Sequence, residues 1–171
     1  MDQPILTLVT MEKFLGQIDA LAGALAASGW RPDYLVGIGR GGLVPAIYLS
    51  HATGLAMLSV DLSVKLPDFG EALLTKLAQR VMAGDKLLFV DDINDSGRTI
   101  NAVRDAMAAI PAEAVRFAVL MDNVRSAAAV DYRAETIDRA VTKDWFVFPW
   151  ETVASRESIL ADWGDVPERT Q

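Results

Sequence analysis

Apolar residues recur along the chain in patterns that predict alternating helices and strands. The first predicted helix spans residues 11–27, where apolar side chains fall at the spacing of one helical face: Phe14, Leu15, Ile18, Leu21, Ala22 and Leu25. Thr10 is a suitable N-cap for this helix, because its hydroxyl can accept a hydrogen bond from the first turn. This segment therefore predicts an amphipathic helix near the start of the chain.

Short apolar runs and further helical stretches follow in alternation. Strands are predicted at residues 34–39, 55–62, 86–90 and 114–121, and helices at 43–54, 71–82 and 98–110. The strand runs are continuously apolar, which is typical of strands covered on both faces. Strand, turn and helix recurring with short connections predict an α/β fold with a mainly parallel, twisted sheet flanked by helices.

Two predicted strands end in turns of unusual composition. In "GIGRGG", residues 37–42, three glycines surround Arg40 and lead into a helix N-terminus, which is a natural site for an anion. The alternative is a tight strand-to-helix turn with a solvated arginine. Because ligands of parallel α/β sheets bind beyond the carboxyl ends of the strands, this turn is a candidate phosphate site.

The second unusual turn lies in "LLFVDDINDSGRT", residues 87–99. Its last five residues open a helix, so their N–H groups and hydroxyls can hold a terminal phosphate. Asp91 and Asp92 lie behind them and can accept hydrogen bonds from a ribose diol or face Mg²⁺. In the alternative interpretation Asp92 or Asp95 caps the helix. Paired acids also occur in receiver domains of response regulators, but there they follow the first strand.

These two turns, in this order and spacing, resemble the pyrophosphate loop and the phosphoribosyl-diphosphate (PRPP) motif of type I phosphoribosyltransferases. The resemblance spans roughly residues 10–152, and Ser96 stands where the family usually has threonine. A third stretch, "DWFVFPWE" at residues 144–151, resembles the hood of the xanthine–guanine and hypoxanthine branch, where Trp-x-x-x-Pro-Trp-acid closes over a purine. Phe148 and Trp150 are expected to pack in the core instead.

The resemblance implies that the chain transfers the 5-phosphoribosyl group from PRPP to xanthine, guanine or hypoxanthine. The products would be a nucleoside monophosphate and pyrophosphate, in Mg²⁺-dependent purine salvage. It implies pyrophosphate binding by Arg40, Gly41 and Gly42, ribose and Mg²⁺ binding by Asp91 and Asp92, and 5′-phosphate binding by Ser96, Gly97, Arg98 and Thr99. It further implies Asp95 as general base, with Asp92 and Arg40 also catalytic, Trp145 stacked on the base and Phe146 offering backbone groups to its edge.

Two departures from the family pattern bear on the substrate. The lysine that usually reads the 6-oxo group is missing, and Asp122 stands about where it is expected, so that Lys143 takes over or the base differs. The catalytic loop, expected at residues 61–71, offers only Lys65. The alternatives are a non-catalytic module that binds PRPP or a nucleotide, and a transferase acting on a different base.

Length and composition bear on the number of domains, the partners and the cellular location. The 171 residues predict a single domain over 1–171, with a hood formed by the N-terminal segment and about 140–152, and a tail at 153–171. The net charge of −7 argues against nucleic acid or anionic membranes as partners, and there is no cysteine for a disulfide or thiolate. Without a secretory-signal pattern at its start, the chain is expected in the cytoplasm, as a homo-oligomer (dimer or tetramer).

Overall fold

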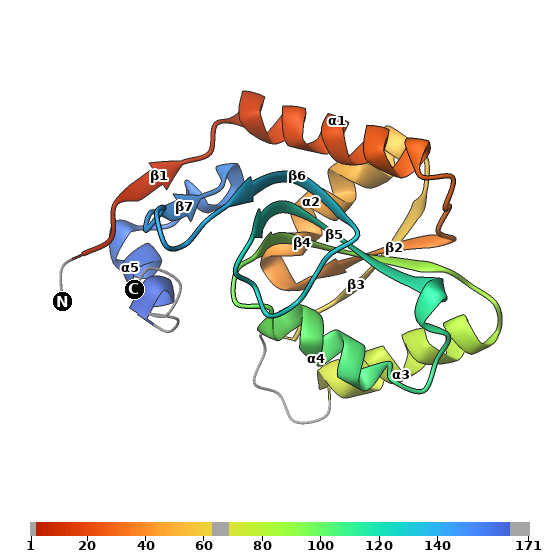
Figure 1. Cartoon of the computed structure of the whole chain (residues 1–171). Coiled ribbons are helices and arrows are strands. Elements are labelled where there is room, and N and C mark those ends of the chain that lie inside the picture. Colours follow the sequence, from red (N-terminus) through yellow and green to blue (C-terminus); the bar gives the residue numbers. More distant parts are fainter. Residues whose placement is uncertain (1–2, 63–68, 165–171) are drawn as a thin grey trace.

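The centre of the molecule is a five-stranded parallel sheet with the order β3-β2-β4-β5-β6 (Figure 1). The computed structural model describes residues 3–62 and 69–164. The strands are β2 (Tyr34–Ile38), β3 (Ala56–Val60), β4 (Leu87–Asn94), β5 (Val115–Asn123) and β6 (Tyr132–Ile137). All neighbouring pairs run parallel. The predicted α/β fold with a parallel sheet flanked by helices is confirmed.

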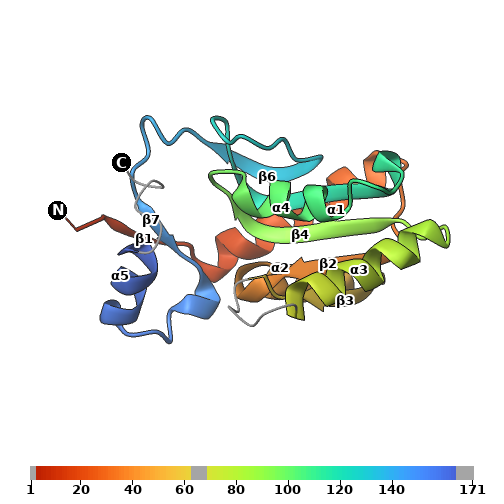
Figure 2. The ribbon, with the colours of Figure 1, turned by 90° about the horizontal axis from the view of Figure 1, so that it is seen from below.

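Helices cover both faces of the sheet and enclose two apolar layers (Figures 1 and 2). One layer holds α1 (Met11–Ala27) and α2 (Gly39–Thr53), and the other holds α3 (Phe69–Met82) and α4 (Arg98–Ala106). Strand β4 contributes side chains to both layers. Leu88 and Val90 point into the first layer, and Leu87 and Phe89 point into the second. This two-sided burial explains why the strand sequences are continuously apolar.

Local sequence explains where α1 begins and where α2 ends. The hydroxyl of Thr10 accepts a hydrogen bond from the N–H of Lys13 at 3.1 Å, as expected for the N-cap of α1. Helix α2 ends at Gly54, whose φ of 71° is the left-handed conformation that glycine adopts without strain.

Several element boundaries differ from the prediction. Helix α2 begins at Gly39, so the glycine turn is the first turn of the helix rather than a loop before it. Strand β4 was predicted to end at residue 90 but continues to Asn94, because its ladder with β5 continues through Asp91, Ile93 and Asn94. Helix α4 ends at Ala106, short of 110. Strand β6 was not predicted at all.

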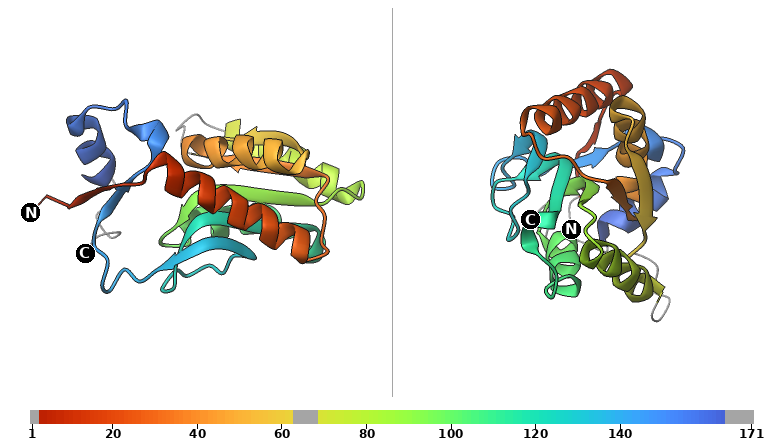
Figure 3. Two further views of the ribbon diagram at one scale, coloured as in Figure 1. Left: turned by 90° about the horizontal axis from the view of Figure 1, so that it is seen from above. Right: turned by 90° about the vertical axis from the view of Figure 1, so that its right-hand side faces the viewer.

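A second, small sheet lies beyond the carboxyl end of β4 (Figures 2 and 3). It pairs β1 (Leu6–Leu8) with β7 (Trp145–Val147) in parallel, and is called the small sheet below. The 3₁₀ helix η2 (Pro149–Glu151) and helix α5 (Arg156–Gly164) follow β7. The chain thus brings its N-terminal strand beside residues 145–147. Within the described residues, no helix combines the length and apolarity needed to cross a bilayer.

Candidate active site

The two unusual turns lie against each other at the carboxyl end of β4. A Cβ built on Gly41 would overlap Oδ2 of Asp92 and lie 2.7 Å from its Cγ. A Cβ on Gly42 would overlap the carbonyl oxygen of Val90 and lie 2.9 Å from the Cα of Asp91. Only glycine allows this approach, so the first turn of α2 rests on the acidic end of β4.

Arg40 lies at the rim of this arrangement. Its side chain is 84% exposed, and Nη2 is 4.0 Å from Oδ2 of Asp162 on α5. An exposed ion pair of this length contributes little to stability. The guanidinium therefore remains accessible to a ligand that approaches the glycine turn.

The turn at residues 95–99 has the form of an anion site. Gly97, with φ of 87°, precedes the first residue of α4, and Oγ of Ser96 accepts a hydrogen bond from the N–H of Arg98 at 3.4 Å. A Cβ on Gly97 would lie 2.7 Å from the backbone N of Ala128, so the segment after β5 supports this turn closely. Asn94 adds to the support, since its Nδ2 donates to the carbonyl of Ala128 at 2.7 Å. The N-terminal N–H groups of α4 are thus held at a fixed position, beside partly exposed Ser96 and Thr99 and exposed Arg98.

Each of the paired acids accepts a hydrogen bond from the backbone N–H of the residue that follows it. Oδ1 of Asp91 accepts the N–H of Asp92 at 3.0 Å, and Oδ1 of Asp92 accepts the N–H of Ile93 at 2.7 Å. No group of three or more His, Cys, Asp or Glu side chains able to hold a metal ion occurs among residues 3–62 and 69–164. A metal bound here would need ligands from a substrate as well.

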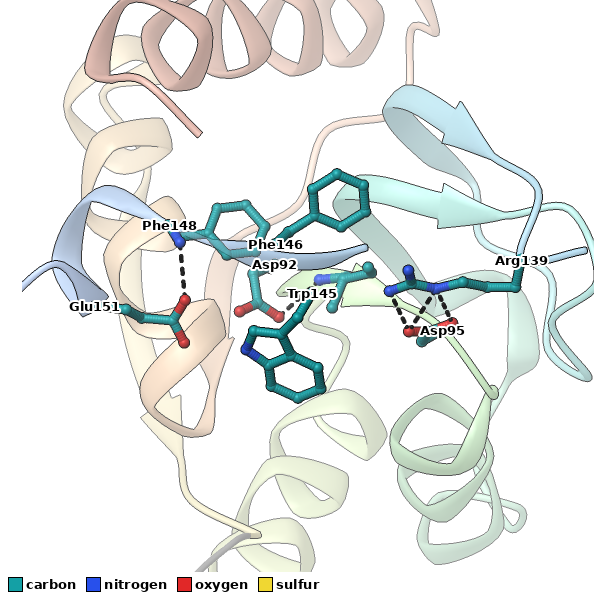
Figure 4. Close-up of a pocket in the computed structure, with 8 residues that line it drawn as sticks. Asp92, Asp95, Arg139, Trp145, Phe146, Phe148 and Glu151 are labelled. Atoms are coloured by element: carbon teal, nitrogen blue, oxygen red, sulfur yellow. Dashed lines mark hydrogen bonds and ion pairs between the residues drawn. The ribbon is translucent and has the colours of Figure 1, made fainter. Parts of the chain in front are cut away.

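A pocket lies between the end of β4 and the small sheet (Figure 4). Its volume of about 40 Å³ is far below the ~300–1,000 Å³ usual for ligand sites. Its walls combine four apolar side chains, three carboxylates and one guanidinium. The lining residues are Asp92, Ile93, Asp95, Arg139, Trp145, Phe146, Phe148 and Glu151.

The aromatic residues of the small sheet reach the pocket from β7, a short strand. The N–H of Trp145 donates to the carbonyl of Ile5 at 2.8 Å, and the carbonyl of Val147 accepts from the N–H of Val9 at 2.9 Å. Because backbone groups alternate in direction along a strand, those of Phe146 point to the edge of β7 away from β1. No other strand among the described residues pairs with that edge. Phe146 thus has backbone groups directed away from the ladder.

Phe148 and Trp150 pack as expected. Phe148 is 2% exposed and stacks on Trp150, with ring centroids 4.8 Å apart and planes inclined by 8°. Trp150 also meets Phe14 of α1 edge to face at 5.3 Å. Phe148 nevertheless also lines the pocket, which was not predicted.

The pocket contains a buried ion pair that the sequence analysis missed. Asp95 and Arg139 have side chains only 3% and 8% exposed. Nε of Arg139 donates to both oxygens of Asp95 at 3.0 Å, and Nη2 donates to Oδ2 at 2.7 Å (Figure 4). Nδ2 of Asn123 also donates to the carbonyl oxygen of Asp95, at 2.9 Å. The carboxylate expected to act as a base is therefore oriented by a guanidinium.

Neither Asp122, which stands where the family's lysine is expected, nor Lys143 lines the pocket. Asp122 is buried and accepts hydrogen bonds from Asn94 at 2.8 Å and Arg133 at 2.7 Å, which makes it part of the support behind the 95–99 turn. Lys143 is exposed on the chain before β7. Lys65 lies outside the described residues, as does most of the expected catalytic loop at 61–71.

Glu151 brings a further carboxyl group to the pocket wall. Burial raises the pKa of Glu151 above its ordinary value, and the nearby charges of Asp92 and Asp162 raise it further. The N–H of Phe148, which donates to Oε2 of Glu151 at 2.8 Å, and the charge of Arg40 act in the opposite direction. The hood pattern "DWFVFPWE" ends on this acid, so the sequence contained a signal for it.

Two anion-type turns and an aromatic cover at the carboxyl edge of a parallel sheet define a site for a phosphorylated ligand with a flat group. Residues 6–155 match the phosphoribosyl transferase domain family. The chain belongs to this family and is a type I phosphoribosyltransferase.

Individual relatives agree with this assignment. Over 129 residues the chain is 35% identical to the xanthine-guanine phosphoribosyltransferase of Cereibacter sphaeroides, which covers 71% of this chain and 70% of the relative. The purine phosphoribosyltransferase of Pyrococcus horikoshii Ot3 superposes with a TM-score of 0.65 at 25% identity, over 88% and 97% of the two chains. A hypothetical Neisseria gonorrhoeae protein, solved with bound ppGpp, shares the fold: TM-score 0.69, 20% identity, 96% and 99% coverage.

Proposed function

We propose that this protein transfers the 5-phosphoribosyl group from PRPP to a 6-oxopurine, giving a nucleoside monophosphate and pyrophosphate, as a step of purine salvage. The carrying observation is the contact between Gly41 and the carboxylate of Asp92, which joins the diphosphate turn to the ribose-binding acids. Trp145 and Ile93 line the adjacent pocket and supply apolar surfaces for a flat base. The similarity to a xanthine-guanine phosphoribosyltransferase supports the choice of base class.

Each part of PRPP has a suitable partner. The backbone of Gly41 and Gly42 and the guanidinium of Arg40 bind the diphosphate, and the N–H groups of residues 96–99 bind the 5′-phosphate. Asp91 and Asp92 accept hydrogen bonds from the ribose hydroxyls. These two residues also fit Mg²⁺, which proteins usually hold through one or two carboxylates plus substrate phosphates. Such an ion would neutralise charge on the departing diphosphate.

The displacement occurs at ribose C1. The bond from C1 to the diphosphate oxygen breaks, positive charge develops on the sugar ring, and a ring nitrogen of the base forms the new bond. Asp95 accepts the proton that this nitrogen system releases. Such general base catalysis contributes roughly 10²–10⁴-fold to the rate. The diphosphate leaves with its electron pair, held by Arg40 and the first turn of α2.

Pyrophosphate release tests this proposal. The protein is incubated with PRPP, Mg²⁺ and one base at a time from a panel of oxopurines, adenine and pyrimidines, with omission of the base or of Mg²⁺ as controls. We expect release with oxopurines that depends on both components. Absence of release with every base overturns the proposal, and release with pyrimidines alone assigns a different acceptor.

A second candidate function is a non-catalytic module that binds PRPP or a nucleotide. The observation in its favour is the engagement of both Asp95 oxygens by Arg139, which leaves the carboxylate less available as a base. The Neisseria gonorrhoeae protein solved with ppGpp shows that this fold occurs with a bound guanine nucleotide.

The variant Asp95→Asn separates the two functions. An enzyme would lose roughly 10²–10⁴-fold in kcat, whereas a binding module would keep its nucleotide affinity and have no turnover to lose. Asp122→Asn is the matched control, because Asp122 also pairs with a guanidinium but does not line the pocket.

A further inference from the structure

Arg139 is a buried cation among the side chains that line the pocket. Its side chain is 8% exposed, and its guanidinium carbon lies 5.3 Å from the centre of the Phe146 ring. The other charged groups of the pocket wall are the carboxylates of Asp92, Asp95 and Glu151. Since arginine is rarely buried unless its donors are used, each N–H group of Arg139 needs a partner or a purpose.

The hydrogen bonds of Arg139 within the described chain use four of its five donors. One N–H on Nε and one on Nη2 bind Asp95, and the two on Nη1 bind the carbonyls of Thr142 at 3.2 Å and Asp144 at 2.6 Å. A guanidinium carries five N–H donors, and the second one on Nη2 remains. The four bonds fix the plane of the guanidinium and so fix the direction of the fifth donor.

The same bonds tie together the two sides of the pocket. Asp95 belongs to the turn that follows β4, whereas Thr142 and Asp144 lead directly into β7, the strand of Trp145 and Phe146. Asp95, Arg139 and Trp145 line one pocket, so a base that stacks on Trp145 with a ring nitrogen towards Asp95 would have its edge beside Arg139. An acceptor on that edge can bind the remaining N–H of Arg139. A donor on that edge cannot, because a guanidinium has no acceptor.

We propose that Arg139 determines which bases are accepted, by donating a hydrogen bond to an oxo or oxyanion acceptor on the base edge and by rejecting an amino group there. This inference rests on the proposed function and names its substrate class: oxopurines rather than aminopurines. Asp95 is then also a positioning residue, because it holds the guanidinium in this orientation. Lys143, the earlier candidate for this task, is exposed and does not line the pocket.

Kinetics of two variants provide the main test. The ratio of kcat/KM for hypoxanthine to kcat/KM for adenine is measured in the wild type, in Arg139→Met and in Lys143→Met. We expect Arg139→Met to lower this ratio about 10- to 100-fold, the range of one charge-assisted hydrogen bond, and Lys143→Met to leave it within about twofold. Arg133→Met is the matched control, because it also removes a guanidinium from a buried aspartate but outside the pocket lining.

A ligand-binding experiment on the unaltered protein covers the case in which Arg139→Met fails to fold. Arginine side-chain ¹⁵N signals are recorded with inosine monophosphate, with adenosine monophosphate and with ribose 5-phosphate, and the Arg139 signal is identified by its absence in Arg139→Lys. We expect this signal to shift with inosine monophosphate and to stay unchanged with ribose 5-phosphate.

The outcomes separate this inference from the proposed function. Absence of turnover with any base in the wild type overturns the proposed function and this inference with it. An active wild type whose oxo-to-amino ratio is unchanged in folded Arg139→Met overturns this inference alone, as does an Arg139 signal indifferent to inosine monophosphate. An oxo-to-amino ratio that falls in Lys143→Met instead of Arg139→Met assigns base recognition to Lys143. That result also overturns the inference about Arg139.

Discussion

The carboxylate of Asp92 lies against the α-carbon of Gly41, so that no side chain fits between them. This contact joins the end of β4 to the first turn of α2. In the proposed function it lies where a carboxylate for ribose hydroxyls and backbone N–H groups for a diphosphate would be adjacent. Acids beside an anion site are compatible with the proposed function, because the two kinds of group would serve neighbouring parts of one ligand.

Gly41→Ala tests the importance of this contact. The new methyl group would displace the Asp92 side chain, which can rotate away, so we expect the fold to survive and the site to be distorted. A displacement of about 1 Å at a reacting centre can reduce the rate roughly 10²-fold, and we expect a fall of that order in kcat/KM for PRPP. Steady-state kinetics and thermal unfolding measure the two effects.

Two further glycine variants serve as comparisons for Gly41→Ala. In Gly42→Ala the methyl group would overlap the backbone of Val90, which cannot rotate away, so stability falls by about 1–3 kcal/mol. Gly23→Ala, in the open on α1, should raise stability by roughly 0.5–1 kcal/mol without affecting kinetics. If Gly41→Ala behaves like Gly23→Ala in both assays, the contact has no functional importance.

Gly97→Ala probes the turn that opens α4. Its φ of 87° strains any residue with a side chain by about 1–2 kcal/mol, and the methyl group would also lie 2.7 Å from the backbone N of Ala128. We expect the free energy of unfolding to fall by more than about 2 kcal/mol and KM for PRPP to rise. Gly84→Ala isolates the strain alone, because its φ is 107° but nothing lies within 4 Å. Equal losses in both variants would contradict the close support of the turn by Ala128.

The sequence predicted the parts of this molecule that depend on neighbouring residues. Helix α1 was predicted from its apolar face and cap, and the strands β2, β4 and β5 from their unbroken apolar runs. The two unusual turns were identified because glycine and acidic residues have local conformational and chemical preferences. The meeting of these turns follows from the common edge of parallel strands.

Features that depend on distant partners were beyond the sequence. Strand β6 has a mixed polar sequence, and its only sheet neighbour among the described residues is β5, so no apolar run marks it. Asp91 and Asp92 extend β4 against their low strand propensity, because the ladder with β5 outweighs it. Arg139 is the clearest case. Nothing near it in "IDRAVTKD" indicates burial, since its partner Asp95 comes from another turn.

Trp145→Ala tests the proposed contact with the base. The indole is half-buried on β7, and Trp145 is the one tryptophan among the described residues that line the pocket. Stacking of a base on an aromatic side chain is worth about 1–3 kcal/mol, so KM for the base should rise roughly 10- to 100-fold. KM for PRPP should change less than about threefold, and Trp145→Phe should retain most of the affinity. Initial-rate kinetics with each substrate varied in turn supply both constants.

Trp30→Ala controls for the loss of an indole. Trp30 packs under the guanidinium of Arg116 at 4.7 Å and donates from Nε1 to the carbonyl of Glu113, at the amino end of the sheet. Removal of the Trp30 indole should lower thermal stability and leave KM for the base and KM for PRPP in their wild-type ratio. A rise in the two KM values by the same factor in Trp145→Ala would instead indicate a general distortion of the pocket.

Glu151→Gln tests the effect of burial on a carboxyl group of the pocket. Burial raises the pKa of Glu151 above the ordinary 4.5, so folding favours its protonated form. The stability linked to that form is complete below about pH 4.5 and is lost as pH rises through the folded-state pKa. Glutamine mimics the protonated carboxyl at every pH. The variant should therefore match the Tm of the wild type near pH 4 and exceed it at pH 7.

The same pH series with Glu157→Gln separates burial from net charge. The chain carries a net charge of −7, so removing any acid reduces general repulsion, but Glu157 is exposed on α5. A Tm difference that widens with pH in Glu151→Gln and not in Glu157→Gln follows from desolvation at the pocket wall. A difference of equal size in both variants would assign the effect to net charge rather than to the burial of Glu151.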